Sequence, residues 1–192
     1  MGQIVVNGIL MGFVYALVAV GLTLTWGVMD IINFAHGEFL MISMYNTFWM
    51  FSLLALDPLV SLPISVVLLF VIGMLTYKGI IKRVINAPGL TALLATFGFS
   101  MFLKNFAQFL WTPNFRYIND AVVSGKTLKL GNIIIGVPQL VAAIASIILT
   151  IVIMLFMDRT KTGKAIQATA LNKNTALLMG INTEKIYAIT FG

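Results

Sequence analysis

The chain has 192 residues, of which 60% are hydrophobic and only 9% are charged, and its mean hydropathy is +1.02. Apolar runs of about 20 residues recur along it, which is the length that a helix needs to cross the hydrocarbon core of a bilayer. The net charge of +6 does not indicate nucleic-acid binding, because the basic residues cluster beside apolar runs, where membrane lipid headgroups account for them. The sequence contains no cysteine, which excludes disulfides and thiolate metal sites.

This composition predicts an all-α, polytopic helical transmembrane protein that forms a single domain over residues 1–192, with five spans and the start of a sixth. The first span is expected at residues 4–29, which is long enough to cross with some tilt. No basic segment precedes it, so we do not interpret it as a signal peptide. Gly8, Gly12 and Ala16 are spaced four residues apart, which favours a packing face for another helix over a lipid-facing surface.

A short polar break at residues 30–38 separates this span from the second, expected at residues 39–56. The break contains His36, the only histidine of the sequence, and Glu38. It is either a tight turn at the membrane surface or a re-entrant piece that lines a cavity. The His-x-Glu spacing does not indicate a metal site, because residues two apart do not share a helical face and the cysteines of a zinc deaminase are missing. Simple solvation and a functional role are equally open for these two groups.

The third span is expected at residues 59–77 and the fourth at residues 90–111. Lys104 lies within the fourth span and shares a helical face with Gln108, so the two form a possible intramembrane polar site. A lysine exposed to lipid at the bilayer centre costs about 2.5 kcal/mol or more, so Lys104 faces protein or water, or extends toward the helix end. We favour the last of these over a place in a transport pathway.

The distribution of basic residues predicts the orientation of the spans. The fifth span is expected at residues 133–157. Eight lysines and arginines lie in residues 78–83 and 158–185, whereas three lie in residues 112–132. The positive-inside rule therefore places the first two segments in the cytoplasm. When the spans are counted back from residues 78–83, the polar break is cytoplasmic if it is a simple turn, and the N-terminus lies outside.

The polar loop at residues 158–185 is the longest polar stretch of the sequence and indicates a docking surface in an aqueous compartment. Two short helices fit it, the first at about residues 163–171 and the second from an N-cap at Asn174 to a left-handed residue at Gly180. Asn182 or Thr183 then caps the next helix, with Glu184 in its first turn. That helix begins an apolar run which stops at residue 192, so we expect a chain cut short within a sixth span.

Residues 32–38 read Ile-Asn-Phe-Ala-His-Gly-Glu, and residues 21–27, 93–98, 159–165 and 176–182 supply further motifs in order. Together these motifs resemble the permease subunits of branched-chain amino acid ABC importers, the LivH type, over nearly the whole chain. The family signature is carried by Asn33, Phe34, Ala35, His36, Gly37 and Glu38.

The resemblance implies that the polar loop docks into a groove of an ATPase subunit. The coupling residues it implies are Arg159, Gly163, Ala165, Ala168, Ala170, Ala176 and Gly180. Ala168, Ala170 and Ala176 are small residues in a water-facing loop, and a close-fitting partner explains them where packing within the chain offers no evident reason. Two departures from the family pattern are Gln167 in place of the usual arginine, and Leu171-Asn172 where acidic residues are common.

The sequence has no P-loop and no nucleophile with a base at a readable spacing, which predicts a transport subunit that is not an enzyme and holds no cofactor. ATP is then used by partner subunits. The resemblance implies a multi-pass protein of the bacterial inner membrane, with a second permease subunit, two cytoplasmic ATPases and an extracytoplasmic binding protein as partners. Urea or short amides are alternative substrates within the family. An ion-coupled carrier has only Lys104 to support it, and an intramembrane enzyme using His36 and Glu38 lacks a third group to orient the base.

Overall fold

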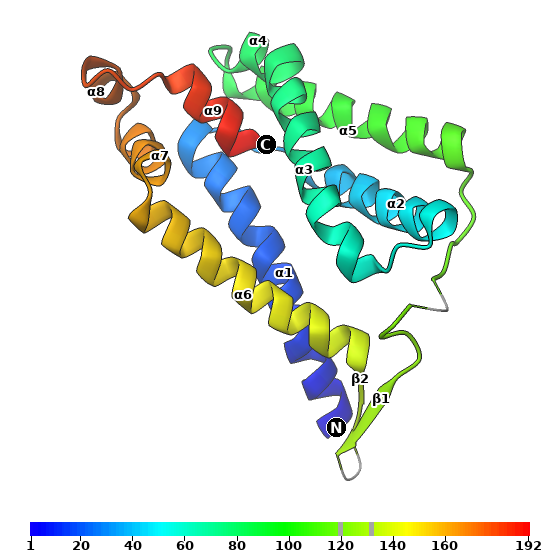
Figure 1. Cartoon of the computed structure of the whole chain (residues 1–192). Coiled ribbons are helices and arrows are strands. Elements are labelled where there is room, and N and C mark those ends of the chain that lie inside the picture. Colours follow the sequence, from blue (N-terminus) through cyan, green and yellow to red (C-terminus); the bar gives the residue numbers. More distant parts are fainter. Residues whose placement is uncertain (119–120, 131–132) are drawn as a thin grey trace. The chain divides into compact units, whose positions relative to one another are not determined.

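The computed structural model describes residues 1–118, 121–130 and 133–192. Regular structure in these ranges is helical apart from one hairpin (Figure 1). The elements in chain order are α1 (Gly2–Met29), α2 (His36–Leu54), α3 (Pro58–Thr76), the π-helical turn η1 (Tyr77–Ile81), α4 (Lys82–Val84), α5 (Gly89–Trp111), β1 (Thr127–Leu130), β2 (Ile133–Gly136), α6 (Val137–Arg159), α7 (Lys161–Leu171), α8 (Lys173–Leu178) and α9 (Thr183–Phe191).

Four helices in the described part of the chain are long and apolar enough to cross a membrane: α1, the continuous rod Pro58–Val84 formed by α3, η1 and α4, then α5 and α6. This agrees with the predicted multi-pass helical protein. The second expected span forms the 19-residue helix α2, but α2 is not one of the four. Two of its polar side chains lie against α3: the Asn46 amide donates a hydrogen bond to Ser65 Oγ at 2.8 Å, and Thr47 Oγ1 lies 3.5 Å from the same atom. The predicted count of five spans and the start of a sixth is thus not confirmed by helix length and hydropathy.

Two expected span boundaries are wrong. The third span does not end at residue 77 but continues without a break through η1 and α4 to Val84. The fifth does not begin at residue 133, because Ile133–Gly136 pairs antiparallel with Thr127–Leu130 and α6 begins only at Val137. Three successive isoleucines favour a strand, and the proline in the first turn of α6 favours a helix start.

The described chain divides into two compact units, and the first comprises residues 1–23 and 118–164. The start of α1 is tied to the hairpin in this unit by the side chain of Gln3. Its Nε2 donates to Ile134 O at 2.6 Å, and its Oε1 accepts from Ile134 N at 2.7 Å, so the amide satisfies both backbone groups of a strand residue. A Cβ atom built at Gly8 or Gly12 meets no atom within 4 Å, so the small-residue face of α1 has no packing partner among the described residues.

The second unit comprises residues 24–117 and 165–192. In it α3 packs against α2 and α9, and α2 packs against α5. Small residues allow these helices to approach closely, as is usual in membranes. Ser61 and Ser65 are buried on α3, and a Cβ atom at Gly73 would collide with the backbone of Phe191 and Gly192. The packed face of α3 therefore depends on side-chain size rather than on bulk apolar contact.

Candidate functional site

The polar break is a turn in which buried and exposed residues alternate. Asp30 ends α1 with a positive φ of 53°, and α2 begins at His36. Between them Asn33 and Ala35 are buried, and Asn33 Oδ1 accepts a hydrogen bond from Ala35 N at 3.1 Å. This side-chain bond closes an Asx turn, which lets the chain reverse without leaving the Ala35 amide unpaired.

The break is also fastened to α5. Thr96, only 1% exposed, directs its hydroxyl at Ile32 O at 3.1 Å and at Leu93 O at 3.0 Å. The rings of Phe34 and Phe97 pack edge to face with centroids 6.1 Å apart. Thr96 lies seven residues into α5, about 10 Å from the start of the helix. The break is therefore held against a membrane helix and is not a freely solvated surface turn.

His36 and Asn33 line a cavity of about 160 Å³. The rest of its wall is mainly apolar and comes from Phe39, Leu40, Leu69, Gly73 and the end of α9. No group of three metal-binding side chains occurs in the described part of the chain. An imidazole and a carboxamide at one side of a small apolar cavity can orient a small ligand or a neighbouring helix.

The polar loop begins with a tight corner between α6 and α7. Thr160 Oγ1 accepts from Gly163 N at 2.9 Å and donates to Phe156 O at 2.7 Å, so Thr160 caps α7. A Cβ atom at Gly163 would collide with the backbone of Phe156 and Met157. The predicted coupling residue Gly163 is thus required by the corner itself. Arg159, also predicted, is the last residue of α6.

The second loop helix does not begin where the sequence suggested. Its N-cap is Asn172, whose Oδ1 accepts from Thr175 N at 3.0 Å, and Asn174 lies inside α8. The prediction of Asn174 as the cap was wrong because α7 ends at Leu171 and leaves Asn172 in the extended conformation that a cap requires. Gly180 has a φ of +79°, which confirms the predicted left-handed residue after α8.

The alanines of the loop differ in their surroundings. Ala176 is only 3% exposed and belongs to α8, which packs against α9, so packing within the chain does explain its size, contrary to the expectation from sequence. Ala165 and Ala168 are half-buried, and Ala170 is exposed. Only the last three remain available to a partner.

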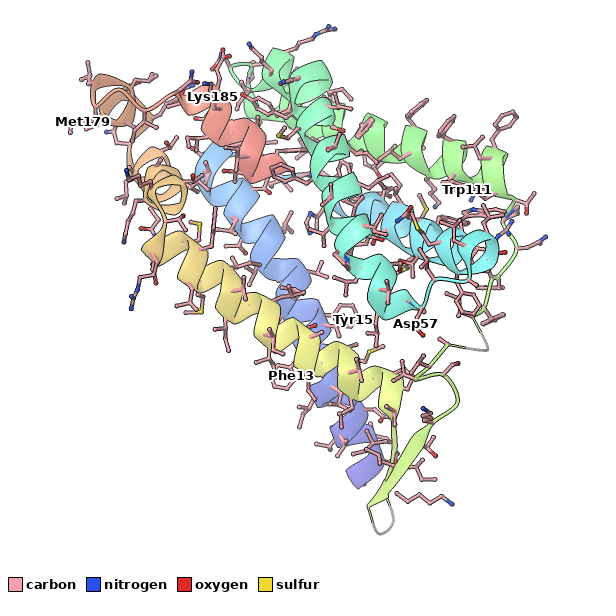
Figure 2. All side chains as sticks on the ribbon, viewed as in Figure 1. Phe13, Tyr15, Asp57, Trp111, Met179 and Lys185 are labelled. Atoms are coloured by element: carbon pink, nitrogen blue, oxygen red, sulfur yellow. The ribbon has the colours of Figure 1, made fainter. Side chains whose placement is uncertain are left out.

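Sequence reasoning missed the most exposed apolar side chains of the loop. Leu171 is 88% exposed, Leu178 is 87% exposed and Met179 is 79% exposed. Met179 is labelled at the outer end of α8 in Figure 2. The signal was present as the run Leu177-Leu178-Met179 before Gly180, inside a stretch that is otherwise polar. We call Leu171, Leu178 and Met179 the exposed apolar triplet.

The loop is anchored within the second unit by its lysines and asparagines. Lys173 Nζ lies 3.4 Å from Asn86 Oδ1 and 5.5 Å from the ring centroid of Tyr187. Asn182 caps α9 by accepting from Lys185 N at 3.1 Å, as predicted. A cavity of about 400 Å³, lined by Asp30, Tyr187 and residues 169–174, lies where the polar break and the polar loop meet.

Residues 4–192 match the family described as branched-chain amino acid transport system / permease component. The chain belongs to this family. It is 30% identical to the high-affinity branched-chain amino acid transport system permease protein BraD of Pseudomonas aeruginosa, over 98% of this chain and 65% of BraD. It is 31% identical to the permease protein LivH of Escherichia coli, over 96% of this chain and 64% of LivH. The chain thus spans slightly less than two thirds of the length of these relatives.

A more distant relative is a probable branched-chain amino acid transport permease protein of Methanocaldococcus jannaschii. It is 28% identical over 88% of this permease chain and 55% of its own length. No solved structure matches the chain. The resemblance read from the motifs is confirmed by these comparisons.

Lys104 and Gln108 lie in neither the polar break nor the polar loop. Both are exposed on α5, whereas the buried side of that helix carries Ala92, Thr96 and Ala107. Lys104 lies seven residues before Trp111, about 10 Å from the helix end. That distance suits a lysine that extends toward the membrane surface.

Proposed function

We propose that this chain belongs to the permease subunit of an ATP-binding-cassette importer that moves branched-chain or other amino acids across the bacterial inner membrane. Two relatives are named as high-affinity branched-chain amino acid permease proteins, which supports this substrate class. The chain has no phosphate-binding loop, so ATP is used by two cytoplasmic ATPase subunits. A second permease subunit and an extracytoplasmic binding protein complete the assembly.

The observation that carries the proposal is the exposed apolar triplet. Three large apolar side chains lie at least 79% exposed within residues 171–179 of a polar, basic loop. The same two helices bury Ile166, Thr169 and Ala176, so the loop is folded and its outward side is a defined surface. Exposed apolar side chains on a folded, polar element favour a protein contact. A groove in an ATPase subunit fits this surface.

Contacts made by α8 connect the loop to the membrane helices. Lys173 in α8 contacts Asn86 after the rod and Tyr187 in α9. The cavity between residues 169–174 and Asp30 leaves room for the loop to shift against the polar break. A displacement of the docked loop is thereby passed to the rod, to α9 and to the break. The His36 cavity lies between these elements and is the part of this chain best placed to respond to that movement.

The chain's contacts support the proposed arrangement of the spans, given that α1 crosses once. The bonds between Gln3 and Ile134 put the starts of α1 and α6 on one side of the membrane. The chain between Asp30 and α6 must then cross an odd number of times. The rod and α5 account for two crossings. We propose that α2 supplies the third, which gives five spans in all. A cysteine at Ser124 should react with an impermeant reagent in intact cells, whereas cysteines at Thr162 and Thr175 should not; labelling of all three would contradict this orientation.

The proposal is tested with Leu178→Gln/Met179→Gln in the permease produced with its ATPases and binding protein. We expect normal membrane insertion, reduced co-purification of the ATPase and at least about a tenfold loss of leucine uptake, because a buried apolar contact would be replaced by polar groups. The matched control is Val122→Gln/Leu128→Gln, two exposed apolar residues of the opposite connection. Normal ATPase retention in both variants would contradict the docking role.

The substrate is examined in the same assay. Unlabelled leucine should compete with labelled leucine for uptake, and urea or acetamide should not. Competition by the amides alone would move the substrate to the alternative class. An ion-coupled carrier is disfavoured because Lys104 lies on an exposed helix face and does not line the His36 cavity.

A further inference from the structure

A basic cavity of about 610 Å³ lies between the rod and the start of α9. Lys185 is labelled near the start of α9 in Figure 2. Polar groups line one part of the cavity and apolar side chains line the rest. The lining residues are Met74, Tyr77, Lys78, Lys82, Asn182, Glu184, Lys185, Ala188 and Ile189.

The charges in this cavity are unbalanced. Lys82 Nζ lies 2.8 Å from Glu184 Oε2, and both side chains remain largely exposed, at 49% and 65%. Within the described ranges, no carboxylate forms an ion pair with Lys78 or Lys185. Three lysines and one glutamate leave the cavity with a net charge of +2.

The cavity lies at a defined depth along the rod. Lys78 follows Pro58 by 20 residues, which is about 30 Å of helix and equals the thickness of the hydrocarbon core. Lys82 lies one turn further, at the level of the lipid headgroups. The π-helical turn, which contains Lys78 and ends just before Lys82, buries Tyr77 and Ile81 on the protein side. Lys78 and Lys82 are exposed, and Lys185 lines the same cavity.

We propose that this cavity binds the phosphate headgroup of an anionic phospholipid. Lys78 and Lys185 contact the phosphate oxygens, and Lys82 contributes when it is released from Glu184. Met74, Ala188 and Ile189 line the part of the cavity that faces the membrane and contact the start of an acyl chain. The ligand chemistry is a phosphate ester with an apolar tail, which a free phosphate ion lacks. This inference does not depend on which amino acid is transported.

The test uses the full chain in detergent, with bound lipid counted by native mass spectrometry. Phosphatidylglycerol, phosphatidylcholine and inorganic phosphate are added separately. We expect retention of phosphatidylglycerol but not of the other two. Lys78→Gln/Lys185→Gln should weaken phosphatidylglycerol binding about 5-fold for each lysine, or roughly 25-fold in total. The matched control, Lys161→Gln/Lys164→Gln, removes two exposed lysines of the polar loop and should leave binding unchanged.

A gain of binding is tested as well, so that a misfolded variant cannot imitate the result. Glu184→Gln removes the only carboxylate of the cavity and frees Lys82, and it should tighten phosphatidylglycerol binding about 5-fold. Three outcomes would overturn the proposal. They are equal losses in both lysine pairs, equal retention of phosphatidylcholine, or binding of inorganic phosphate that phosphatidylglycerol does not displace.

Discussion

The polar break at residues 30–38 buries one polar side chain, Asn33, whereas the polar loop at residues 158–185 turns apolar side chains outward. In the break, Asn33 is buried and Thr96 of α5 donates to the Ile32 carbonyl. In the loop, Leu178 and Met179 are almost fully exposed although they belong to a folded helix end. Both segments interrupt apolar helices, but the apolar side chains of the loop are the more exposed, because Ile32 and Phe34 of the break are only 45% and 46% exposed. The break therefore contributes to the chain's own packing, and the loop is the surface at which we propose that a partner docks.

The largest effect is expected at a glycine of the polar loop, and a glycine of the polar break serves as its control. Gly163→Ala places a methyl group against the backbone of Phe156 and Met157, which cannot move aside as a flexible side chain can. We expect a loss of about 3 kcal/mol in the free energy of unfolding, measured by thermal unfolding in detergent. Gly37→Ala is the control, because a Cβ atom there meets nothing within 4 Å. It should leave stability unchanged or raise it by up to about 1 kcal/mol. Equal losses in both variants would contradict the tight corner.

The next comparison concerns two buried threonines. Thr96→Val removes the hydroxyl that joins α5 to the break and leaves the Ile32 carbonyl without that donor. We expect a destabilisation of about 1–2 kcal/mol. Thr169→Val removes only a local bond to the Ala165 carbonyl, which keeps its own helical partner. That variant should cost less than about 0.5 kcal/mol. Similar melting temperatures for the two variants would show that the hydroxyl does not hold the break.

Sequence reasoning located the long helices because their apolar runs are long and uniform. The helix α5 begins and ends within one residue of its prediction. Sequence reasoning failed where the local structure of a segment depends on the segments that pack against it. The start of α6 was placed four residues too early, because an apolar strand and an apolar helix have the same composition and only pairing with β1 separates them. The burial of Ala176 depends on α9, which lies later in the chain and could not be placed from sequence.

A third comparison separates the two candidate caps of the loop. Asn172→Ala removes the side-chain acceptor of Thr175 N and should cost about 1 kcal/mol. Asn174→Ala replaces a weak helix former inside α8 with the best one, so it should be neutral or slightly stabilising. Hydrogen exchange at the Thr175 amide reports the difference directly, with faster exchange expected in Asn172→Ala only. Faster exchange in Asn174→Ala instead would restore the cap expected from sequence.

The smallest expected effect concerns two lysines, one on a membrane helix and one in the loop. Lys104 is exposed on α5 and has no protein partner in the described part of the chain. Lys104→Met should therefore change the free energy of unfolding by less than about 0.5 kcal/mol and leave leucine uptake nearly unchanged. Lys173→Met is the matched change in the polar loop, where it removes the contacts with Asn86 and Tyr187. It should cost about 1 kcal/mol and loosen the attachment of α8. Loss of uptake in Lys104→Met at normal membrane levels would place that lysine in the transport pathway, and the exposed side of α5 would then face another subunit rather than lipid.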